Sequence, residues 1–151
     1  MAAVILTLAL GGAAQAAALA SSVTGDYTYQ FLTNTTTIHL DARAGDPATG
    51  SFSYVSGFAS FSGPVTCVTV IGSDAWVAGP ITAITEGSTF GYDGWAERVH
   101  DGGTPGAQSD TAITFVDTFD AMVKYCQSAK TRSDKSMVPV TAGNLVVHAA
   151  R

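Results

Sequence analysis

The sequence contains few charged residues, and basic residues are the scarcest. Asp, Glu, Lys and Arg make up 13% of the 151 residues, about half of the usual share of about a quarter. Lys and Arg number 7 against 12 acidic residues, which gives a formal net charge of −5 at pH 7. A nucleic-acid-binding surface needs a cationic face to displace the counterions of the phosphates. The basic run at residues 130–135 is short and typical of a solvated loop, so we expect no nucleic-acid partner.

Long apolar runs are absent after the N-terminus. Residues 2–14 are predominantly apolar, but such a run is too short to cross a bilayer as a helix. Two A-x-A sites follow, at residues 14–16 and 18–20, and this order is typical of a secretory signal peptide. We therefore predict a helical signal peptide over residues 1–20 and one secreted, soluble, β-barrel-like domain over residues 21–151. A buried N-terminal helix is the alternative.

Helical periodicity is scarce after residue 21, and alternation with a period of two replaces it. Apolar and polar side chains alternate most clearly in residues 26–31, 37–43 and 95–101, which indicates strands with one face in water. Turn signals such as AGDPATG at residues 44–50 separate these segments. About seven to nine short strands with such spacing predict an all-β fold, an antiparallel small barrel or sandwich.

One later segment has helical spacing, and it predicts a short helix over residues 118–128. Asp117 or Thr118 is the expected N-cap. The apolar residues at positions i, i+3, i+4 and i+7 are Phe119, Met122, Val123 and Cys126.

Cysteine is also scarce, because the chain contains only Cys67 and Cys126. In an exported protein an even number of cysteines predicts a disulfide. Closing a loop of about 60 residues would stabilise the fold by up to about 4 kcal/mol, and the bond would join the helix to the sheet. Alternation places Val65 and Cys67 on one face of their strand. A reactive thiol needs a base and an electropositive setting, and Cys67 has no charged neighbour in sequence.

The segment around Cys67, GPVTCVTVIGSDAWVAGPIT, resembles the pattern G-x-V-T-C-L-x-V-x-G-N-x-A-x-I-G-G of small exported proteins of soil bacteria, chiefly actinobacteria and their neighbours. The segments IHLDARAG, VHDGGTPGAQSD and PVTAGNLVVH extend the resemblance over most of residues 36–148. Gly103 stands where these proteins have a different spacing of Asn and Gly, which leaves the geometry of that loop open. The resemblance implies export, the disulfide and a secreted β-barrel-type domain, and it supplies no catalytic residue.

The histidines lack the spacing of a local metal site. His39, His100 and His148 stand on the polar faces of predicted strands, without i, i+4 or H-x-H spacing. Two of them, brought together by neighbouring strands, would bind a metal with Glu97 or Asp41. Exposed strand histidines are the favoured interpretation.

Oxygen ligands gather around the polar loop at residues 101–110. Asp101, Asp110 and Glu97 are the candidate calcium ligands there. The spacing of an EF-hand and the nonapeptide repeat are both absent, so a polar connector is favoured and no cofactor is expected.

Four aromatic residues are the candidates for a ligand pocket or a sugar platform. Trp76, Trp95, Tyr92 and Phe90 lie within about 20 residues of one another. Trp76 and Trp95 are more often core residues than pocket residues.

Motifs that carry chemistry are missing. The sequence has no G-x-S-x-G, no P-loop and no G-x-G-x-x-G after a strand. A non-enzymatic secreted or cell-surface domain that acts by binding or as a structural component is therefore favoured, and its partner is unknown. One alternative is a lipocalin-like carrier of a small apolar ligand, which predicts a cavity of several hundred Å³ inside the sheet and is excluded by a filled core. The other is an enzyme of the hydrolase or cyclase type, which predicts a cleft with at least two titratable groups of shifted pKa.

Overall fold

The computed structural model describes residues 20–103, 109–129 and 137–150. Nearly all of the predicted signal peptide and the basic run at 130–135 lie outside these residues. The described part contains ten strands and one helix. The strands are β1 (Ser22–Phe31), β2 (Asn34–Arg43), β3 (Thr49–Val55), β4 (Ala59–Pro64), β5 (Cys67–Ile71), β6 (Asp74–Pro80), β7 (Ala83–Gly87), β8 (Gly94–His100), β9 (Thr111–Asp117) and β10 (Val138–His148).

The ten strands form one antiparallel sheet in the order β5-β6-β8-β9-β10-β1-β2-β3-β4-β7. The predicted all-β class is therefore confirmed. More strands are present than the sequence predicted, because two long segments are each interrupted. Pro64 ends β4 and Pro80 ends β6, and a proline has no N–H to continue a ladder of hydrogen bonds.

The sheet is curled, and the two interruptions lie beside each other. Thr66 N donates to Ala78 O at 2.9 Å, so the pairing with β6 already begins one residue before β5 starts. A Cβ atom at Gly63 would lie 1.8 Å from Pro80 O, so only glycine permits this approach of β4 to β6. As a result β5 and β7, at opposite ends of the strand order, continue directly from β4 and β6.

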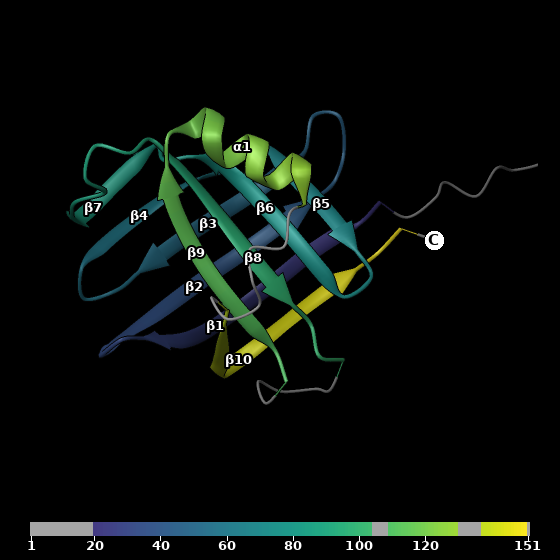
Figure 1. Ribbon diagram of the computed structural model, residues 1–151, viewed down its shortest axis with the longest axis horizontal. Coiled ribbons are helices and arrows are strands. Elements are labelled where there is room, and N and C mark those ends of the chain that lie inside the picture. The colour runs from purple at the N-terminus through teal and green to yellow at the C-terminus, as the bar shows by residue number, and fades with distance from the viewer. Residues whose placement is uncertain (1–19, 104–108, 130–136, 151) are drawn as a thin grey trace, which may run out of the picture.

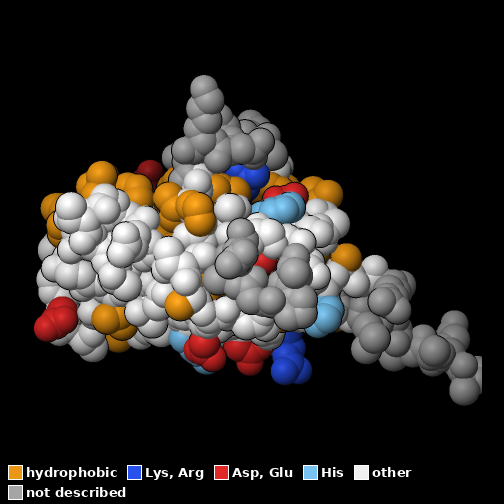
Figure 2. All heavy atoms as spheres, turned by 90° about the horizontal axis from the view of Figure 1, so that it is seen from below, with side chains coloured by type: hydrophobic (Ala, Val, Ile, Leu, Met, Phe, Trp, Pro, Cys, Tyr) orange, Lys and Arg blue, Asp and Glu red, His pale blue; other side chains and the backbone are white. Residues whose placement is uncertain are grey.

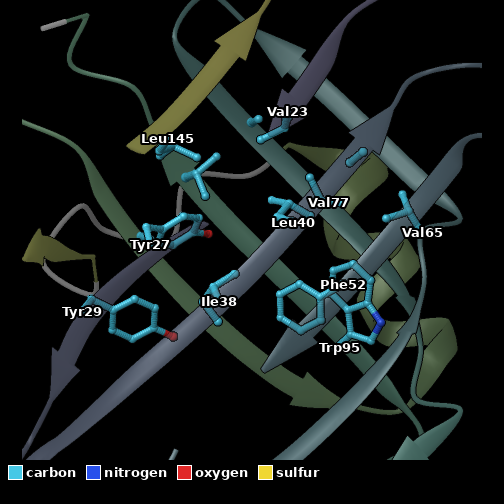
Figure 3. Close-up of a cluster of buried hydrophobic side chains, with 14 of the residues drawn as sticks. Val23, Tyr27, Tyr29, Ile38, Leu40, Phe52, Val65, Val77, Trp95 and Leu145 are labelled. Carbon is cyan, nitrogen blue, oxygen red and sulfur yellow. The ribbon is translucent and has the colours of Figure 1, made fainter. Parts of the chain in front are cut away.

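One cluster of buried side chains fills the inner face of the curled sheet (Figure 3). Phe52 of β3 stacks on Trp95 of β8, with ring centroids 4.0 Å apart and planes at 11°. These strands are not neighbours in the sheet, so this contact crosses the interior. Further labelled members are Val23, Tyr27, Tyr29, Ile38, Leu40, Val65, Val77 and Leu145. The alternation in residues 26–31 and 37–43 thus correctly predicted inward-facing side chains.

The helix α1 (Phe119–Ser128) packs on the outer face of β5, β6 and β8 (Figure 1). Thr118 is its N-cap, and its hydroxyl accepts a hydrogen bond from Ala121 N at 3.4 Å, so the predicted helix is confirmed. Cys126 of α1 forms a disulfide with Cys67 of β5, which joins the helix to the sheet as predicted. Buried side chains around this bond are Trp76, Ala78, Ala96 and Met122.

The predicted shared face of Val65 and Cys67 is wrong. Val65 belongs to the interior cluster, whereas Cys67 packs under the helix on the outer face. Residues 65–66 lie between β4 and β5 and are not part of either strand. The backbone changes direction there, so strict alternation does not continue across the break.

Candidate ligand pocket and buried polar cluster

The four aromatic residues proposed as a pocket do not come together. Trp95 lies in the interior core, while Trp76 lies on the outer face beneath α1. Phe90 and Tyr92 line two different hollows, of about 370 Å³ and about 490 Å³. The tryptophans separate because they stand on opposite faces of two paired strands, β6 and β8.

A different set of residues lines the apolar hollow of about 370 Å³, which we call the end pocket. It opens where β1 and β3 end, where β4 begins and where the loop after β7 passes. Most of its wall is aromatic or aliphatic. The lining residues are Phe31, Tyr54, Phe58, Ala59, Phe61, Ser88, Thr89, Phe90, Thr114 and Val116. Several were visible in the sequence as apolar residues of separate strands, but no local signal indicated that they would meet.

Large apolar side chains are exposed around the mouth of the end pocket. Phe90 is 86% exposed and Phe58 is 59% exposed, and both line the pocket. Figure 2 shows hydrophobic side chains gathered toward the end of the molecule that carries β4 and β7 in Figure 1. Contiguous exposed apolar surface of this kind marks a binding site more often than scattered exposed residues do.

Two exposed residues, one in the wall of the end pocket and one outside it, have an unusual backbone conformation. Phe90 and Leu32 both have φ of 57°, in the left-handed region. This region is unfavourable for residues other than glycine, asparagine and aspartate. Because Phe90 is 86% exposed and Leu32 is 78% exposed, little packing energy offsets this conformation.

A buried polar cluster lies in the interior beside the end pocket. Glu97 of β8 is fully buried and accepts hydrogen bonds from the Tyr27 hydroxyl at 2.8 Å and the Thr114 hydroxyl at 2.5 Å. The Tyr29 oxygen lies 2.7 Å from Thr114 Oγ1 and accepts a bond from Thr114 N at 3.2 Å. Since the Thr114 hydroxyl proton is directed at Glu97, Tyr29 is the donor to Thr114 Oγ1. Tyr29 thus donates a hydrogen bond to Thr114, and Thr114 donates one to Glu97.

Burial shifts the titration of this cluster. Burial raises the pKa of Glu97 from 4.5 to about 7, and the hydrogen bonds from Thr114 and Tyr27, which favour the carboxylate, oppose that rise. Burial, assisted by the negative charge of Glu97, also raises the pKa values of Tyr27 and Tyr29 above their usual range. The two tyrosines therefore stay protonated, and Glu97 is the member of the cluster that titrates near neutral pH.

Thr114 belongs to both the end pocket and the polar cluster. It is partly exposed, and its side chain contributes to the pocket wall. The other hydroxyl side chains of the wall are Tyr54, Ser88 and Thr89. Two of them make hydrogen bonds within their own loop: Ser88 Oγ accepts from Phe90 N at 3.0 Å, and Thr89 donates to Tyr92 O at 2.8 Å. Thr114 is thus the hydroxyl of the wall that connects the pocket with an ionisable group.

The three candidate calcium ligands do not form one group. Glu97 faces the interior, whereas Asp101 accepts from Val147 N at 2.9 Å and Asp110 accepts from Gly102 N at 3.0 Å. In the described residues no cluster of three or more His, Cys, Asp or Glu side chains is suited to hold a metal ion. Residues 104–108 of the same loop lie outside that description.

Two of the three histidines pair with single carboxylates instead, and His148 is exposed at the end of β10. His39 Nδ1 lies 2.6 Å from Asp26 Oδ1, and His100 Nδ1 lies 3.2 Å from Asp74 Oδ1. The His39–Asp26 pair is exposed and the His100–Asp74 pair is half-buried, and the two pairs belong to different strands. They are surface ion pairs when the imidazoles are protonated, and such pairs contribute little to stability.

Taken together, the fold and the pocket define an antiparallel β protein with a ligand-sized hollow at one end of its sheet. Comparisons of the chain with protein-family models, with curated proteins and with solved structures found no match. Within the described residues, no helix has the length and apolar character needed to cross a membrane.

Proposed function

We propose that this chain is an exported β-barrel protein that binds a small apolar molecule in the end pocket. The observation that carries the proposal is the pocket itself, about 370 Å³ in volume and walled mainly by aromatic and aliphatic side chains. Ligand sites for small molecules typically occupy about 300–1,000 Å³ and have mostly apolar walls with a few polar groups. The hydroxyl groups of Tyr54, Ser88, Thr89 and Thr114 are the polar groups of this wall.

Closure of the sheet into a barrel is part of the proposal. The ten strands become eight when β4–β5 and β6–β7 are each counted as one bent strand. The contact between Phe52 and Trp95 across the interior supports this closure. An eight-stranded barrel has room for packed side chains or one small ligand. In this chain the middle is filled by the core, so the ligand belongs at the end.

Export is supported by two features of the sequence and by the disulfide. The N-terminal apolar run and the A-x-A sites are typical of a signal peptide. A disulfide such as Cys67–Cys126 persists outside the reducing cytoplasm. The proposal therefore places ligand binding outside the cytoplasm.

Binding is favoured over catalysis by the position of Glu97. The carboxyl group is fully buried, and Thr114 stands between it and the pocket. A general acid or base has to come within hydrogen-bond distance of the reacting atom, directly or through one water. Glu97 does not line the pocket and is connected to it only through its hydrogen bond with Thr114. This position suits ligand recognition better than general acid or base catalysis.

Substitution of Phe90 tests the proposal. Phe90→Gly removes part of the pocket wall, but it also relieves a left-handed backbone conformation. We expect the affinity for the neutral fluorescent probe N-phenyl-1-naphthylamine to fall roughly tenfold, corresponding to about 1.4 kcal/mol of lost apolar contact. The melting temperature should stay the same or rise.

Leu32→Gly is the matched control. Leu32 has the same φ of 57° and is similarly exposed, but it is not part of the pocket wall. This variant should gain the same stability and bind the probe like the wild type. Equal probe binding by wild type and Phe90→Gly, or no binding by the wild type, would contradict the proposal.

A further inference from the structure

Aromatic side chains make up half of the wall of the end pocket. Of its ten lining residues five are aromatic, and none of the ten is charged. Tyr54 and Phe61 stack on each other with ring centroids 4.8 Å apart, whereas Phe58 is 59% exposed and Phe90 is 86% exposed at the mouth. A ligand in the pocket therefore contacts aromatic rings contributed by five segments of the chain. These aromatic residues are Phe31, Tyr54, Phe58, Phe61 and Phe90.

A negative charge lies directly behind this wall when Glu97 is ionised. Thr114, which lines the pocket, donates a hydrogen bond to the Glu97 carboxyl group at 2.5 Å, and Tyr27 donates another at 2.8 Å. Both hydrogen bonds favour the carboxylate form. Because Glu97 is fully buried, its charge is screened much less by water and salt than a charge on the surface.

The basic side chains of the described residues lie elsewhere. Arg43 ends β2, and this strand runs away from Phe31 and the pocket. The Arg98 guanidinium lies 5.4 Å from the centre of the Trp76 ring, on the outer face of the sheet. Lys124 belongs to α1 on the same outer face, where it lines a separate hollow. In this part of the chain, no basic group lines the pocket and offsets the charge of Glu97.

We propose that the end pocket selects apolar organic cations, such as molecules with a quaternary ammonium group, which contact the aromatic wall and are attracted by the Glu97 carboxylate. This inference rests on the proposed function, because it assigns a ligand class to the same pocket. A cation over an aromatic ring is attracted by the negative face of the ring, and aromatic cages bind quaternary ammonium groups in this way. A quaternary ammonium has no N–H to donate, so the directions of the hydroxyl groups in the wall do not decide its binding.

Two benzenes of nearly equal shape provide the test. Phenyltrimethylammonium is positively charged at every pH, and tert-butylbenzene is its neutral isostere. Their affinities are measured by displacement of N-phenyl-1-naphthylamine at pH 8.5, where a carboxyl group with a pKa of about 7 is ionised. The wild type should bind the ammonium more tightly, by roughly threefold or more. A merely apolar pocket would favour the hydrocarbon, because removing a charge from water is unfavourable, and this result would overturn the inference.

Phe58→Leu tests the contribution of the aromatic wall. It replaces an exposed ring with an aliphatic side chain, so we expect the fold to be retained. The affinity for the ammonium should fall roughly two- to fivefold, and the affinity for tert-butylbenzene should fall less. Phe58→Tyr keeps a ring and should retain the preference of the wild type. Equal losses for both ligands in Phe58→Leu would overturn the inference.

Glu97→Gln tests the contribution of the buried charge at nearly constant size. It should weaken binding of the ammonium roughly 3- to 10-fold and change binding of tert-butylbenzene little. Glu86→Gln is the matched control, because it removes a charge that is exposed to water on β7. Screening makes that charge less effective, so the control should weaken binding of the ammonium less. An undiminished preference for the ammonium in Glu97→Gln would overturn the inference.

The outcomes distinguish the two proposals. If the fluorescent probe binds the wild type but the ammonium does not displace it better than tert-butylbenzene does, the inference about the cation fails and the ligand pocket stands. If neither benzene binds and the fluorescent probe does not bind either, the proposed function fails. If Glu97→Gln does not fold, the comparison of the two benzenes in the wild type, Phe58→Leu and Phe58→Tyr still decides the inference.

Discussion

Glu97 is expected to make the protein less stable as the pH rises through neutrality. Its pKa is about 7 in the folded protein, compared with 4.5 as the ordinary value, a difference of about 2.5. At 1.36 kcal/mol for each pH unit, this corresponds to about 3 kcal/mol. Between these two pKa values the folded state holds a proton that the unfolded state has lost. The stabilisation is therefore complete below about pH 4.5 and is lost as the pH rises through about 7.

Urea unfolding of the wild type and Glu97→Gln between pH 4.5 and 8.5 measures this effect. Glutamine has nearly the same size and cannot ionise, so its free energy of unfolding should lack this contribution. Relative to the wild type, the variant should gain about 3 kcal/mol from the lowest to the highest pH. Subtracting the free energy of unfolding of the wild type from that of the variant at each pH removes the contribution of the ionisable groups that both proteins contain.

Glu86→Gln is the control, because Glu86 lies exposed on β7. The difference between Glu97→Gln and the wild type should change more with pH than the difference between this exposed control and the wild type. A difference between Glu97→Gln and the wild type that stays constant across this range would refute the assignment of the titrating carboxyl to Glu97.

Two further predictions concern stability alone. Replacing both Cys67 and Cys126 with alanine should lower the free energy of unfolding by up to about 4 kcal/mol, because the bond closes a loop with a sequence separation of 59; equal melting temperatures for the oxidised wild type and this variant would contradict that role. Gly63→Ala should destabilise the protein by more than about 2 kcal/mol, because its Cβ atom would lie 1.8 Å from Pro80 O. Urea unfolding measures this loss, and a variant as stable as the wild type would show that β4 and β6 separate easily at this point.

Local features of this chain were readable from neighbouring residues. The alternation in residues 37–43 correctly placed Ile38 and Leu40 inward, because successive side chains of a strand point to opposite faces. The helix at 118–128 followed from the spacing of its apolar residues, and capping chemistry limited its N-cap to Asp117 or Thr118, of which the structure has Thr118. The disulfide followed from the count of two cysteines in a chain with an expected signal peptide.

The end pocket depended on long-range pairing that local patterns do not encode. Phe31, Phe58 and Phe90 come from three distant segments, and only the strand order and the curl of the sheet bring them together. Alternation correctly grouped Glu97 with Trp95 and Val99, but whether that face meets water or the core depends on the strands across the interior. Periodicity reports which side chains share a face, whereas burial depends on what that face packs against, and the tertiary structure alone decides this.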